Sequence, residues 1–531
     1  MAYEGNLVTI PFGQYGIMTD MNPTDLPPNS LISANDVVLN PGYIEKAPGS
    51  MKYNTATLNS EKIVAGFDYW PTTIQQRLIV ATDVGSIYRD IGDRGFSLGT
   101  AIKTGLSGLT NQCMFIEGGK ETAGRDKKLF LISRTNQVQV LAADGTSFAA
   151  ISNPATDWVS PNFPRCGVIH RNRLWLFMQQ GSYASNSGDH ENFTSSFLVD
   201  NIYPGEGGDI IKATVYKGRL FVFKEGGFVY YLDDSDTSTS NWFFRKLDTG
   251  ISTASSHSMF QVVNDLVIGT STGSLVSLVA AQSLGDIKSA DIYSQVKCEQ
   301  FIRNSTSSSG LSGMHSYYYE EKKQAYFTYH TKYNTQNDAF VTLDMSSQTP
   351  RILFNKKDKP TCFFGRRDIN GVTRPCYGAA DGFVYFMDRP DRDVGGSSFS
   401  SEFQTPHFDF RHVDPNLAGK KKIFDNFKME FIETGSWNIS VDIFIDGDLK
   451  ETLTIPCSNR NHNLDAFILD SDELSAEETQ RSVEQPLHGS GRTLSIRIRS
   501  TGLQQNFKIA SFTVGFRVGA EDAARLANGP S

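Results

Sequence analysis

Seven stretches of this chain repeat one pattern, in which two apolar runs flank a short turn that contains Gly or Asn. One apolar or aromatic position recurs in register, at successive intervals of 51, 45, 46, 46, 60 and 51 residues. It is occupied by Leu78, Leu129, Leu174, Leu220, Leu266, Tyr326 and Tyr377. A period of roughly 40–50 residues with strand content in every unit is typical of propeller blades, because a single four-stranded blade cannot bury both of its faces.

Apolar side chains occupy both faces of the repeated runs. In RLFVFKEGGFVYY, Leu220 and Val222 share one face and Phe221 lies on the other, which predicts a strand covered on both sides. Glycine stands in the turns VGS, EGG, TGS and DGF, where a tight hairpin needs positive φ. We therefore predict an all-β chain with a propeller of about seven blades, with six to eight compatible with the spacing. A long β-sandwich or several small β domains are the alternatives.

The pattern divides the chain into four parts. Residues 1–58, rich in Pro, Asn and Gly, predict an extended N-terminal lead-in that crosses other elements, and residues 59–394 hold the propeller. Residues 395–519 carry strands split by TGS and DGD turns, which is typical of a compact β-sandwich. Residues 520–531 are expected to form a C-terminal tail. The 60-residue interval after Leu266 predicts a larger blade loop, and an N-terminal strand is a candidate to complete the last blade.

Charge and apolar content restrict the partners that the chain can have. The formal net charge is −8, whereas proteins that grip nucleic acid neutralise phosphates with an excess of Lys and Arg. No apolar stretch reaches the roughly 18–20 residues of a membrane span, and the first residues lack the basic and apolar regions of a signal peptide. We expect no membrane span, no tight hold on DNA, and synthesis in the cytoplasm.

The six cysteines form no CxxC pair, which argues against a disulfide scaffold and against zinc. We expect all of them to be small buried residues: Cys113, Cys166, Cys298, Cys362, Cys376 and Cys457. An acidic run, DSDELSAEETQRSVEQ, contrasts with them because it contains a single Arg. It is interpreted as a solvated insertion or short exposed helix, or else as an acidic rim on an assembly. Its acids are Asp470, Asp472, Glu473, Glu477, Glu478 and Glu484.

Catalytic and metal-binding motifs are absent from the sequence. GGKETAGRDKK lacks the spacing of a phosphate loop, and neither HExxH nor a GxSxG elbow occurs. His190 and Glu191 form an adjacent pair without a second ligand at helical spacing. Two acidic runs lack the glycine and terminal glutamate of a calcium loop and are interpreted as hairpin turns. These runs contain Asp233, Asp234 and Asp236, and Asp442, Asp446 and Asp448.

Some propellers carry paired catalytic carboxylates of glycoside hydrolases. The candidates for such a pair all lie in or beside hairpin turns, where Asp is first of all a turn former. They are Asp83, Asp144, Asp189 and Asp381. We therefore assign no catalytic, cofactor-binding or metal-binding residue, and we predict that the chain is not an enzyme and needs no cofactor.

Two segments resemble structural proteins of tailed bacteriophages. NPTDLPPNSLISANDVVLNPGYIEKAPG is similar to their N-terminal strand, and HRNRLWLFMQQGSYASNSGDHENF, continued by TGISTASSHSMFQVVNDLVIGTSTGSL, is similar to their blades. The matching positions are Gly42, Ile44, Pro48 and Gly49, then His170 to Trp175, Ser185, Gly188, Asp189, Asn192 and Phe193, and finally Gly250, His257 and Gly273. These motifs are structural rather than catalytic, so they indicate architecture more than activity.

The family that the chain resembles is the tail nozzle, or packaged-DNA stabilisation, family of short-tailed phages. The resemblance implies six copies in a ring of propellers below the portal and adaptor, in the virion tail, around a channel that retains and then conducts double-stranded DNA. A mildly acidic ring is consistent with such a conduit, since Lys and Arg would retard the duplex. The C-terminal sandwich departs from the shorter members and leaves the position in the tail open.

Two other classes of function remain compatible with the sequence. A propeller that binds or degrades carbohydrate would need aromatic and carboxylate side chains gathered at one mouth. A receptor-binding or scaffold protein of the tail would assemble with a symmetry other than six-fold. Propellers carry many activities, so the repeat alone selects none of these.

Overall fold

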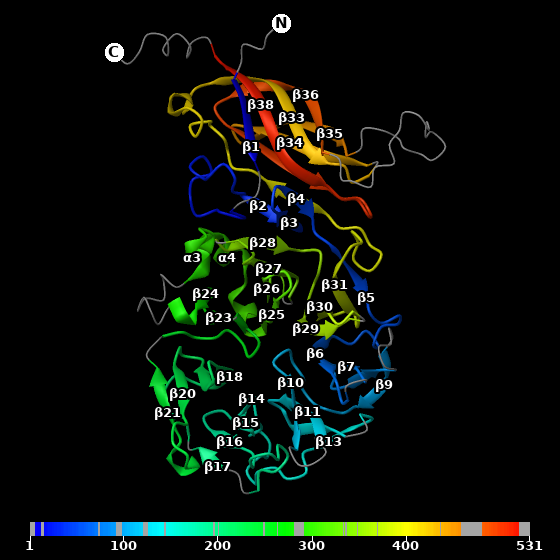
Figure 1. Cartoon of the computed structure of the whole chain (residues 1–531), viewed down its shortest axis with the longest axis vertical. Helices are drawn as coiled ribbons and strands as arrows, with labels where there is room; N and C mark the ends of the chain where they lie inside the picture. Colours follow the sequence, from blue (N-terminus) through cyan, green and yellow to red (C-terminus); the bar gives the residue numbers. More distant parts are fainter. Residues whose placement is uncertain are drawn as a thin grey trace.

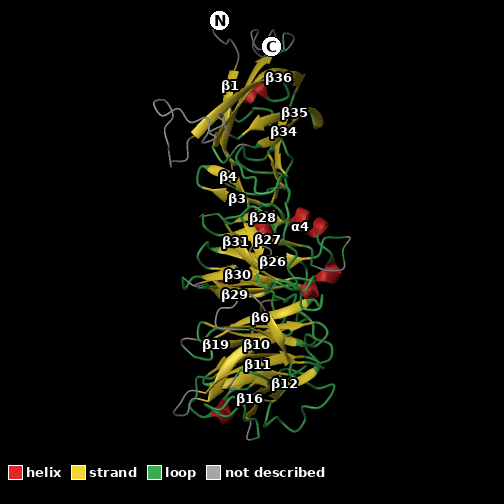
Figure 2. Cartoon of the chain, turned by 90° about the vertical axis from the view of Figure 1, so that its right-hand side faces the viewer, coloured by secondary structure: helices red, strands yellow, loops and turns green. Residues whose placement is uncertain are grey.

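A computed structural model of the chain gives the arrangement of its strands. The structure describes residues 6–11, 15–72, 75–91, 98–120, 126–142, 145–194, 197–199, 201–247, 250–262, 264–280, 291–332, 334, 337–347, 349–368, 370–435, 437–457 and 480–519. Figure 1 shows an elongated molecule with a ring of small sheets in its lower part and a sandwich of longer strands at the top. Turned by 90°, the molecule is much narrower (Figure 2).

The first four blades are four-stranded antiparallel sheets whose strands follow one another in the sequence. Blade one contains β6 (Ile63–Tyr69), β7 (Arg77–Thr82), β8 (Ile87–Asp90) and β9 (Leu98–Lys103). Blade two contains β10 (Met114–Lys120), β11 (Asp126–Ser133), β12 (Asn136–Leu141) and β13 (Phe148–Ala150). Blade three contains β14 (Cys166–His170), β15 (Arg173–Phe177), β16 (Ser182–Ala184) and β17 (Phe197–Val199). Blade four contains β18 (Ile210–Tyr216), β19 (Arg219–Lys224), β20 (Val229–Asp233) and β21 (Phe243–Leu247), with the 3₁₀ turn η1 (Thr239–Asn241) before the last strand.

The remaining blades depart from this local order. Blade five has three described strands, β22 (Met259–Val262), β23 (Asp265–Gly269) and β24 (Leu275–Ser277). Blade six contains β25 (Ser316–Tyr319), β26 (Gln324–Tyr329), β27 (Ala339–Asp344) and β28 (Arg351–Asn355). Blade seven contains β29 (Cys362–Arg367), β30 (Thr373–Gly378) and β31 (Val384–Arg389), and its outer strand is β5 (Gly49–Lys52) from the other end of the chain. The prediction that an N-terminal strand completes the last blade is confirmed.

The long interval after Leu266 holds helical structure. Between β24 and β25 lie α3 (Ile292–Gln295), α4 (Glu299–Ser305) and the 3₁₀ segment η2 (Ser308–Gly313). The side chain of Asp291 caps α3 by accepting a hydrogen bond from the backbone N–H of Tyr293 at 3.0 Å. The predicted larger blade loop is therefore present, and it lengthens the interval without adding a blade.

Apolar contacts between neighbouring blades close the ring. Ile79 of blade one packs in one core with Leu129 of blade two, and blades two to four share a core around Trp175. Shared cores also join blades four and five, six and seven, and seven and one. Blades five and six meet through Phe260 and Phe327, whose ring centroids are 5.2 Å apart. The larger part of the chain is thus a seven-bladed β-propeller, as the repeat predicted.

The C-terminal strands form two packed sheets that also take in the N-terminal strands. One sheet contains β1 (Asn6–Pro11), β3 (Val37–Asn40), β4 (Tyr43–Lys46), β33 (Lys422–Ile432), β36 (Gln480–Gly491) and β38 (Lys508–Val518). The other contains β2 (Ser33–Asn35), β32 (Ser401–Gln404), β34 (Asn438–Ile445), β35 (Asp448–Pro456) and β37 (Leu494–Ser500), and the 3₁₀ turn η3 (Pro415–Leu417) precedes β33. Aromatic side chains fill the space between the sheets, with the rings of Phe410 and Phe516 4.5 Å apart.

The N-terminal segment is not a separate lead-in. Its strands β1 to β4 belong to the sandwich and β5 belongs to blade seven. In these places the N-terminal strands cover strand edges that would otherwise be exposed. All six cysteines are buried and free, as expected. Of the acidic run, Glu484 lies in β36 and accepts a hydrogen bond from Asn426 at 2.6 Å, while its other predicted acids and the predicted tail lie outside the described residues.

Candidate functional site at the propeller–sandwich junction

The carboxylates considered for glycoside hydrolysis lie in separate turns and form hydrogen bonds or ion pairs there. Asp83 accepts from the N–H of Lys62 at 3.1 Å, and Asp381 accepts from the hydroxyl of Tyr385 at 2.8 Å. Asp189 pairs with a lysine of blade two at 3.3 Å. No hydrogen bond joins any two of these three in the described part of the chain, and Asp144 lies outside it.

The two acidic runs also serve turns and ion pairs. Buried Asp234 accepts from His170 Nε2 at 2.8 Å and from Arg171 Nε at 2.7 Å, while Asp446 sits in the β34–β35 turn with φ of 53°. The other four acids of these runs bind Arg, Lys, Ser, Thr or Asn side chains. Within the described ranges no three His, Cys, Asp or Glu side chains are placed to hold a metal ion.

His190 and Glu191 likewise support the blades. The ring Nδ1 of buried His190 accepts from the N–H of Gly119 at 3.0 Å, and Glu191 pairs with Lys128 at 2.6 Å. Both contacts join blade three to blade two. The described groups that the sequence predicted are therefore engaged in turns and contacts of the propeller or, for Asp442, Asp446 and Asp448, of the sandwich.

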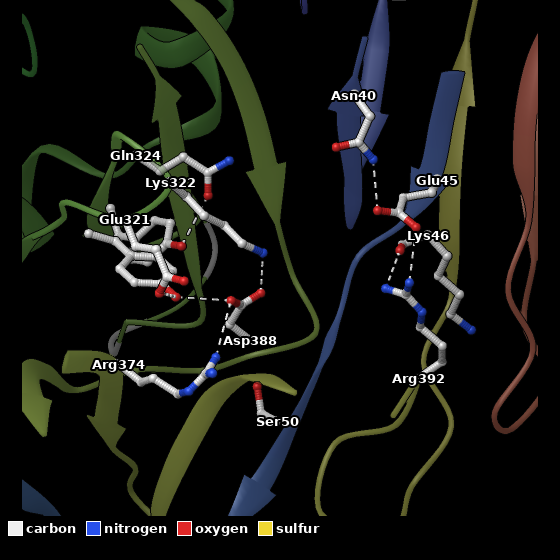
Figure 3. Close-up of polar contacts among 12 residues, drawn as sticks. Asn40, Glu45, Lys46, Ser50, Glu321, Lys322, Gln324, Arg374, Asp388 and Arg392 are labelled. Atoms are coloured by element: carbon white, nitrogen blue, oxygen red, sulfur yellow. Dashed lines mark hydrogen bonds and ion pairs between the residues drawn. The ribbon is translucent and has the colours of Figure 1, made fainter. Parts of the chain in front are cut away.

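A polar network between elements lies where the propeller meets the sandwich (Figure 3). Its centre is Asp388, whose carboxylate pairs with Lys322 Nζ, accepts from the Tyr319 hydroxyl at 3.1 Å and lies 3.8 Å from an Arg374 nitrogen. Tyr319 also donates to Glu321 at 2.8 Å. Asp388 has a φ of 57° and stands where β31 slips its register against β5. This network ties blade six to blade seven.

A second cluster clamps the segment that leaves blade seven. Arg392 donates to the Glu45 carboxylate at 3.0 Å and to the backbone oxygen of Lys46 at 2.7 Å, and Asn40 holds the other Glu45 oxygen at 2.7 Å. The Lys46 ammonium is buried and donates to the carbonyl of Gly502 at 3.2 Å. Burial, reinforced by the Arg392 charge, lowers the pKa of Lys46 to about 8. The connecting segment is thus fixed to the β3–β4 hairpin.

Buried charged side chains lie on the inner side of this junction. Asp36 has a φ of 54°, and its Oδ1 accepts from the N–H groups of Lys356 and Lys357 at 3.0 and 3.1 Å. Burial raises the pKa of Asp36 to about 7, although the Lys357 charge opposes the shift. Lys357 also pairs with Asp358, which accepts from the Tyr377 hydroxyl at 2.9 Å.

Backbone hydrogen bonding also crosses the junction. The outer strand of blade six, β28, pairs in parallel with β2, which pairs with β32 of the sandwich. Blade six and one sandwich sheet therefore form a single nine-stranded sheet. Beside Asp388 the remaining space is about 40 Å³, enough for one or two waters but far below the roughly 300 Å³ of a small-ligand pocket. The described contacts at the junction thus join blade six and the sandwich through one continuous sheet.

The axis of the propeller is closed by contacts between blades that lie across the ring. Stacked His257 and His315 have ring centroids 4.2 Å apart, and His257 Nε2 lies 2.9 Å from the Cys113 carbonyl of blade two. The N–H of Phe363 in blade seven donates to His315 Nδ1 at 3.1 Å. Burial lowers the pKa of both rings, that of His315 to about 3, so both are neutral at pH 7. The axis is therefore packed with side chains at this level.

One mouth of the propeller carries a cavity of about 480 Å³, formed by segments of blades two, four, five and six. Its wall holds seven Ser or Thr residues, two amides, Arg134 and Glu225, and no aromatic side chain. Neutral sugars are generally held by stacking on aromatic faces, so the aromatic cluster expected of a carbohydrate-binding mouth is missing from this cavity.

Sequence reasoning did not single out the junction residues. Asp388 and Arg392 stand in DRPDRDVGG, a polar and glycine-rich run whose composition is typical of a linker. The alternating Asp and Arg of that run are a signal of ion pairing, but their partners lie in β4, β25, the β25–β26 turn and β30, and no local pattern names them. Only the pairing of distant strands brings these charges together.

Comparisons with known proteins identify no family for this chain. No protein-family model and no curated protein matches this chain. Among solved structures, YCF48 bound to a D1 peptide is similar at 10% identity and a TM-score of 0.39, covering 67% of this chain and 97% of its own. The extracellular domain of the putative hybrid two-component system BT3049 from B. thetaiotaomicron aligns at 11% identity and a TM-score of 0.43, covering 88% and 57% respectively. The computationally designed Ika8 protein aligns at 9% identity and 0.36, covering 64% and 99%. At these values the similarity carries no information on what this chain binds.

Proposed function

We propose that the chain is a structural subunit of a phage tail, of the nozzle type, that assembles as a homohexameric ring in the virion. The ring retains the packaged double-stranded DNA and then conducts it, without reading its sequence. Assembly from the host cytoplasm onto the adaptor, the head-to-tail connector, would bring the subunit next to other tail proteins. The proposal rests first on the phage-type motifs of the sequence.

The observation that carries the proposal is the rigid joint between the two parts. A ring under internal pressure must not open between its domains, and here a nine-stranded sheet, the Asp388 network and the Arg392 clamp all cross or flank the same joint. Because the propeller axis is packed around His257 and His315, DNA would run between subunits rather than through a propeller. The net charge of −8 favours passage over retention by phosphate contacts.

In the described segments no helix is both long and apolar enough to cross a bilayer.

Imaging tests the proposal directly. Purified protein, alone and after mixing with adaptor-bearing phage heads, is examined by negative stain and cryo-electron microscopy. Six-fold rings at the tail vertex are the expected result. Particles whose tail density for this chain has three-fold symmetry or a single copy would refute the nozzle assignment, while a monomer in the absence of the adaptor agrees with it.

A receptor-binding propeller of the tail is the second candidate. The 480 Å³ mouth cavity favours it, since its size falls within the range of ligand pockets. Incubation with host surface glycans, followed by binding and cleavage assays, separates the two candidates. Saturable glycan binding by a chain that forms no ring would favour the receptor-binding protein, and cleavage would reveal an enzyme.

A further inference from the structure

The mouth cavity contains a positive charge that no described residue neutralises by contact. Arg134 lines it from the turn between β11 and β12. Its guanidinium makes no hydrogen bond or ion pair with any described residue, and its Nε is buried without an acceptor. A guanidinium stays charged in proteins, and burying a charged donor without an acceptor costs several kcal/mol unless an anion or water satisfies it. The arrangement calls for an acceptor from outside the chain.

A second cation, Lys212, lies near the cavity without lining it. Lys212 follows Ile211, a cavity-lining residue of β18, and its ammonium has no hydrogen-bond or ion-pair partner among the described residues. The charges of Lys212 and Arg134 both act on Cys166 and on His257, which places the two cations around one buried region. Burial lowers the pKa of Lys212 to about 8, as expected for an ammonium without a counterion.

The carboxylates near these cations do not neutralise their positive charge. Asp209 is engaged with a third cation, Arg165, at 2.5 Å. Glu225 is the single acid lining the cavity, and it lies outside the 4.0 Å limit of an ion pair with Arg134 within the described chain. Arg134, Lys212 and Arg165 therefore lie near two carboxylates, those of Asp209 and Glu225, and the local balance is positive in a chain whose overall charge is −8.

The walls are preformed and rich in hydroxyl groups. The side chain of Asn111 donates to the Gly313 carbonyl at 2.6 Å, Thr253 and Ser258 share a hydrogen bond of 2.9 Å, and the hydroxyl of Thr135 donates to the Ser107 carbonyl at 2.7 Å. These bonds hold together loops from blades two, five and six. A polar molecule can enter such a pocket without ordering it first, which lowers the cost of binding.

We propose that this mouth cavity binds a small oxyanion, a carboxylate or phosphate group carried by a hydroxyl-rich molecule, with Arg134 as its principal ligand and Lys212 as the second positive charge. A planar guanidinium matches both groups by paired N–H donors. The cavity of about 480 Å³ exceeds a bare ion and leaves room for a polar body against the Ser and Thr wall. This inference is independent of the assembly of the chain.

Calorimetric titration of the full chain tests it with three probes at matched ionic strength: sodium phosphate, sodium glucuronate and neutral glucose. We expect saturable binding of phosphate or glucuronate in the millimolar range and none of glucose. The better anion identifies the group that the site prefers. Arg134→Gln should weaken binding by about tenfold or more, the effect of losing hydrogen bonds between charged partners. Lys212→Gln should weaken it as well, and it tests the site independently should the first variant not fold.

Arg245→Gln is the matched control, since it removes one Arg charge from an outer strand of blade four, where the side chain is half exposed. It should leave binding unchanged. The inference is overturned if neither anion binds up to about 20 mM, well above the millimolar range expected of a weak specific site. It is equally overturned if glucose binds as tightly as glucuronate, if Arg134→Gln and Lys212→Gln bind like the unmodified chain, or if Arg245→Gln causes the same loss as they do.

Discussion

The propeller and the sandwich differ in how far apart their paired strands lie in the sequence. In blades one to four every sheet consists of consecutive strands, so each partner is a few residues away across a hairpin. In the sandwich, β38 pairs with β1 and β4 from the other end of the chain, and the hydroxyls of Thr9 and Thr513, 504 positions apart, share a hydrogen bond. The same kind of antiparallel pairing is thus local in one part and almost maximally distant in the other.

This difference has a consequence for folding and stability. Closing a hairpin costs little conformational entropy, whereas bringing the two chain ends together must wait until much of the intervening chain is ordered. Blade six stands between the two regimes, because its own hairpins are local while its outer strand β28 continues into the sandwich through β2. We therefore expect the sandwich to depend on the N-terminal strands far more than blades one to four do.

Removing residues 1–48 is the strongest test of this contrast. The deletion takes β1 to β4 from the sandwich but leaves β5 in blade seven. We expect the sandwich to unfold, because β38 loses the strands on one side and its apolar face becomes exposed. Limited proteolysis with mass spectrometry should find cleavage within residues 401–519 and protection of blades one to four. A truncated chain with the protection pattern of the full one would contradict the dependence.

Truncating the sandwich core should produce the next largest effect. Phe512 is fully buried, with its ring 5.9 Å from Phe408 and 6.1 Å from Phe427. Phe512→Ala should lower the free energy of unfolding by about 3–5 kcal/mol, the usual cost of removing a buried aromatic ring. Phe243→Ala, on an outer strand of the propeller with 46% exposure, should change it by less than about 0.5 kcal/mol. Denaturant titration measures both, and equal losses would show that the core is not where these contacts place it.

The buried charge of Asp36 should make the joint sensitive to pH. Its folded-state pKa of about 7 lies above the ordinary value of 3.8, so the folded state holds the proton more tightly than the unfolded state. This contribution to stability is greatest below pH 4, falls as the pH rises towards 7 and is constant above it. Asp36→Asn keeps the Oδ1 acceptor and suits the positive φ, and it removes the charge.

The Asp36→Asn variant should therefore gain stability over the unmodified chain as the pH rises. The difference should be near zero at pH 4 and reach at most about 4 kcal/mol above pH 7, at about 1.4 kcal/mol per pH unit. Thermal unfolding of both proteins between pH 4 and 8 measures it. A pH-independent difference would show that Asp36 is not the group that titrates.

The Asp388 network should give the smallest of these effects. Asp388→Asn preserves the shape and the left-handed backbone while weakening the bonds to Lys322 and Arg374, so we expect a loss of about 1–3 kcal/mol. Asp448→Asn, whose carboxylate is 78% exposed beside Lys450, is the control and should have no measurable effect. Chemical denaturation compares them. Equal stability of the two variants would show that the Asp388 network does not stabilise the contact of blade six with blade seven.

Much of the propeller follows from its sequence because each blade is specified locally. The alternation around Leu220 and the glycine turns define hairpins without reference to the rest of the chain. The interpretation of residues 1–58 as an extended lead-in did not identify the pairing of β4 with β38, since nothing near Ile44 names Ile509 as its partner. The candidate sites divide in the same way. The acids in turns were recognised as turn formers, whereas the junction around Asp388 and the cavity around Arg134 depend on residues from separate blades.

The sequence by itself determined the all-β class, the number of blades, the buried state of the cysteines and the lack of recognised catalytic motifs, because periodicity, turn chemistry and residue type act over a few positions. Only the tertiary structure decided which strands the N-terminal strands pair with and how blade six shares a sheet with the sandwich. It also decided which cations lie together near the mouth cavity. Those features depend on pairing between strands that are hundreds of residues apart. The stability of such a pair depends on both strands together, so neither strand alone predicts it.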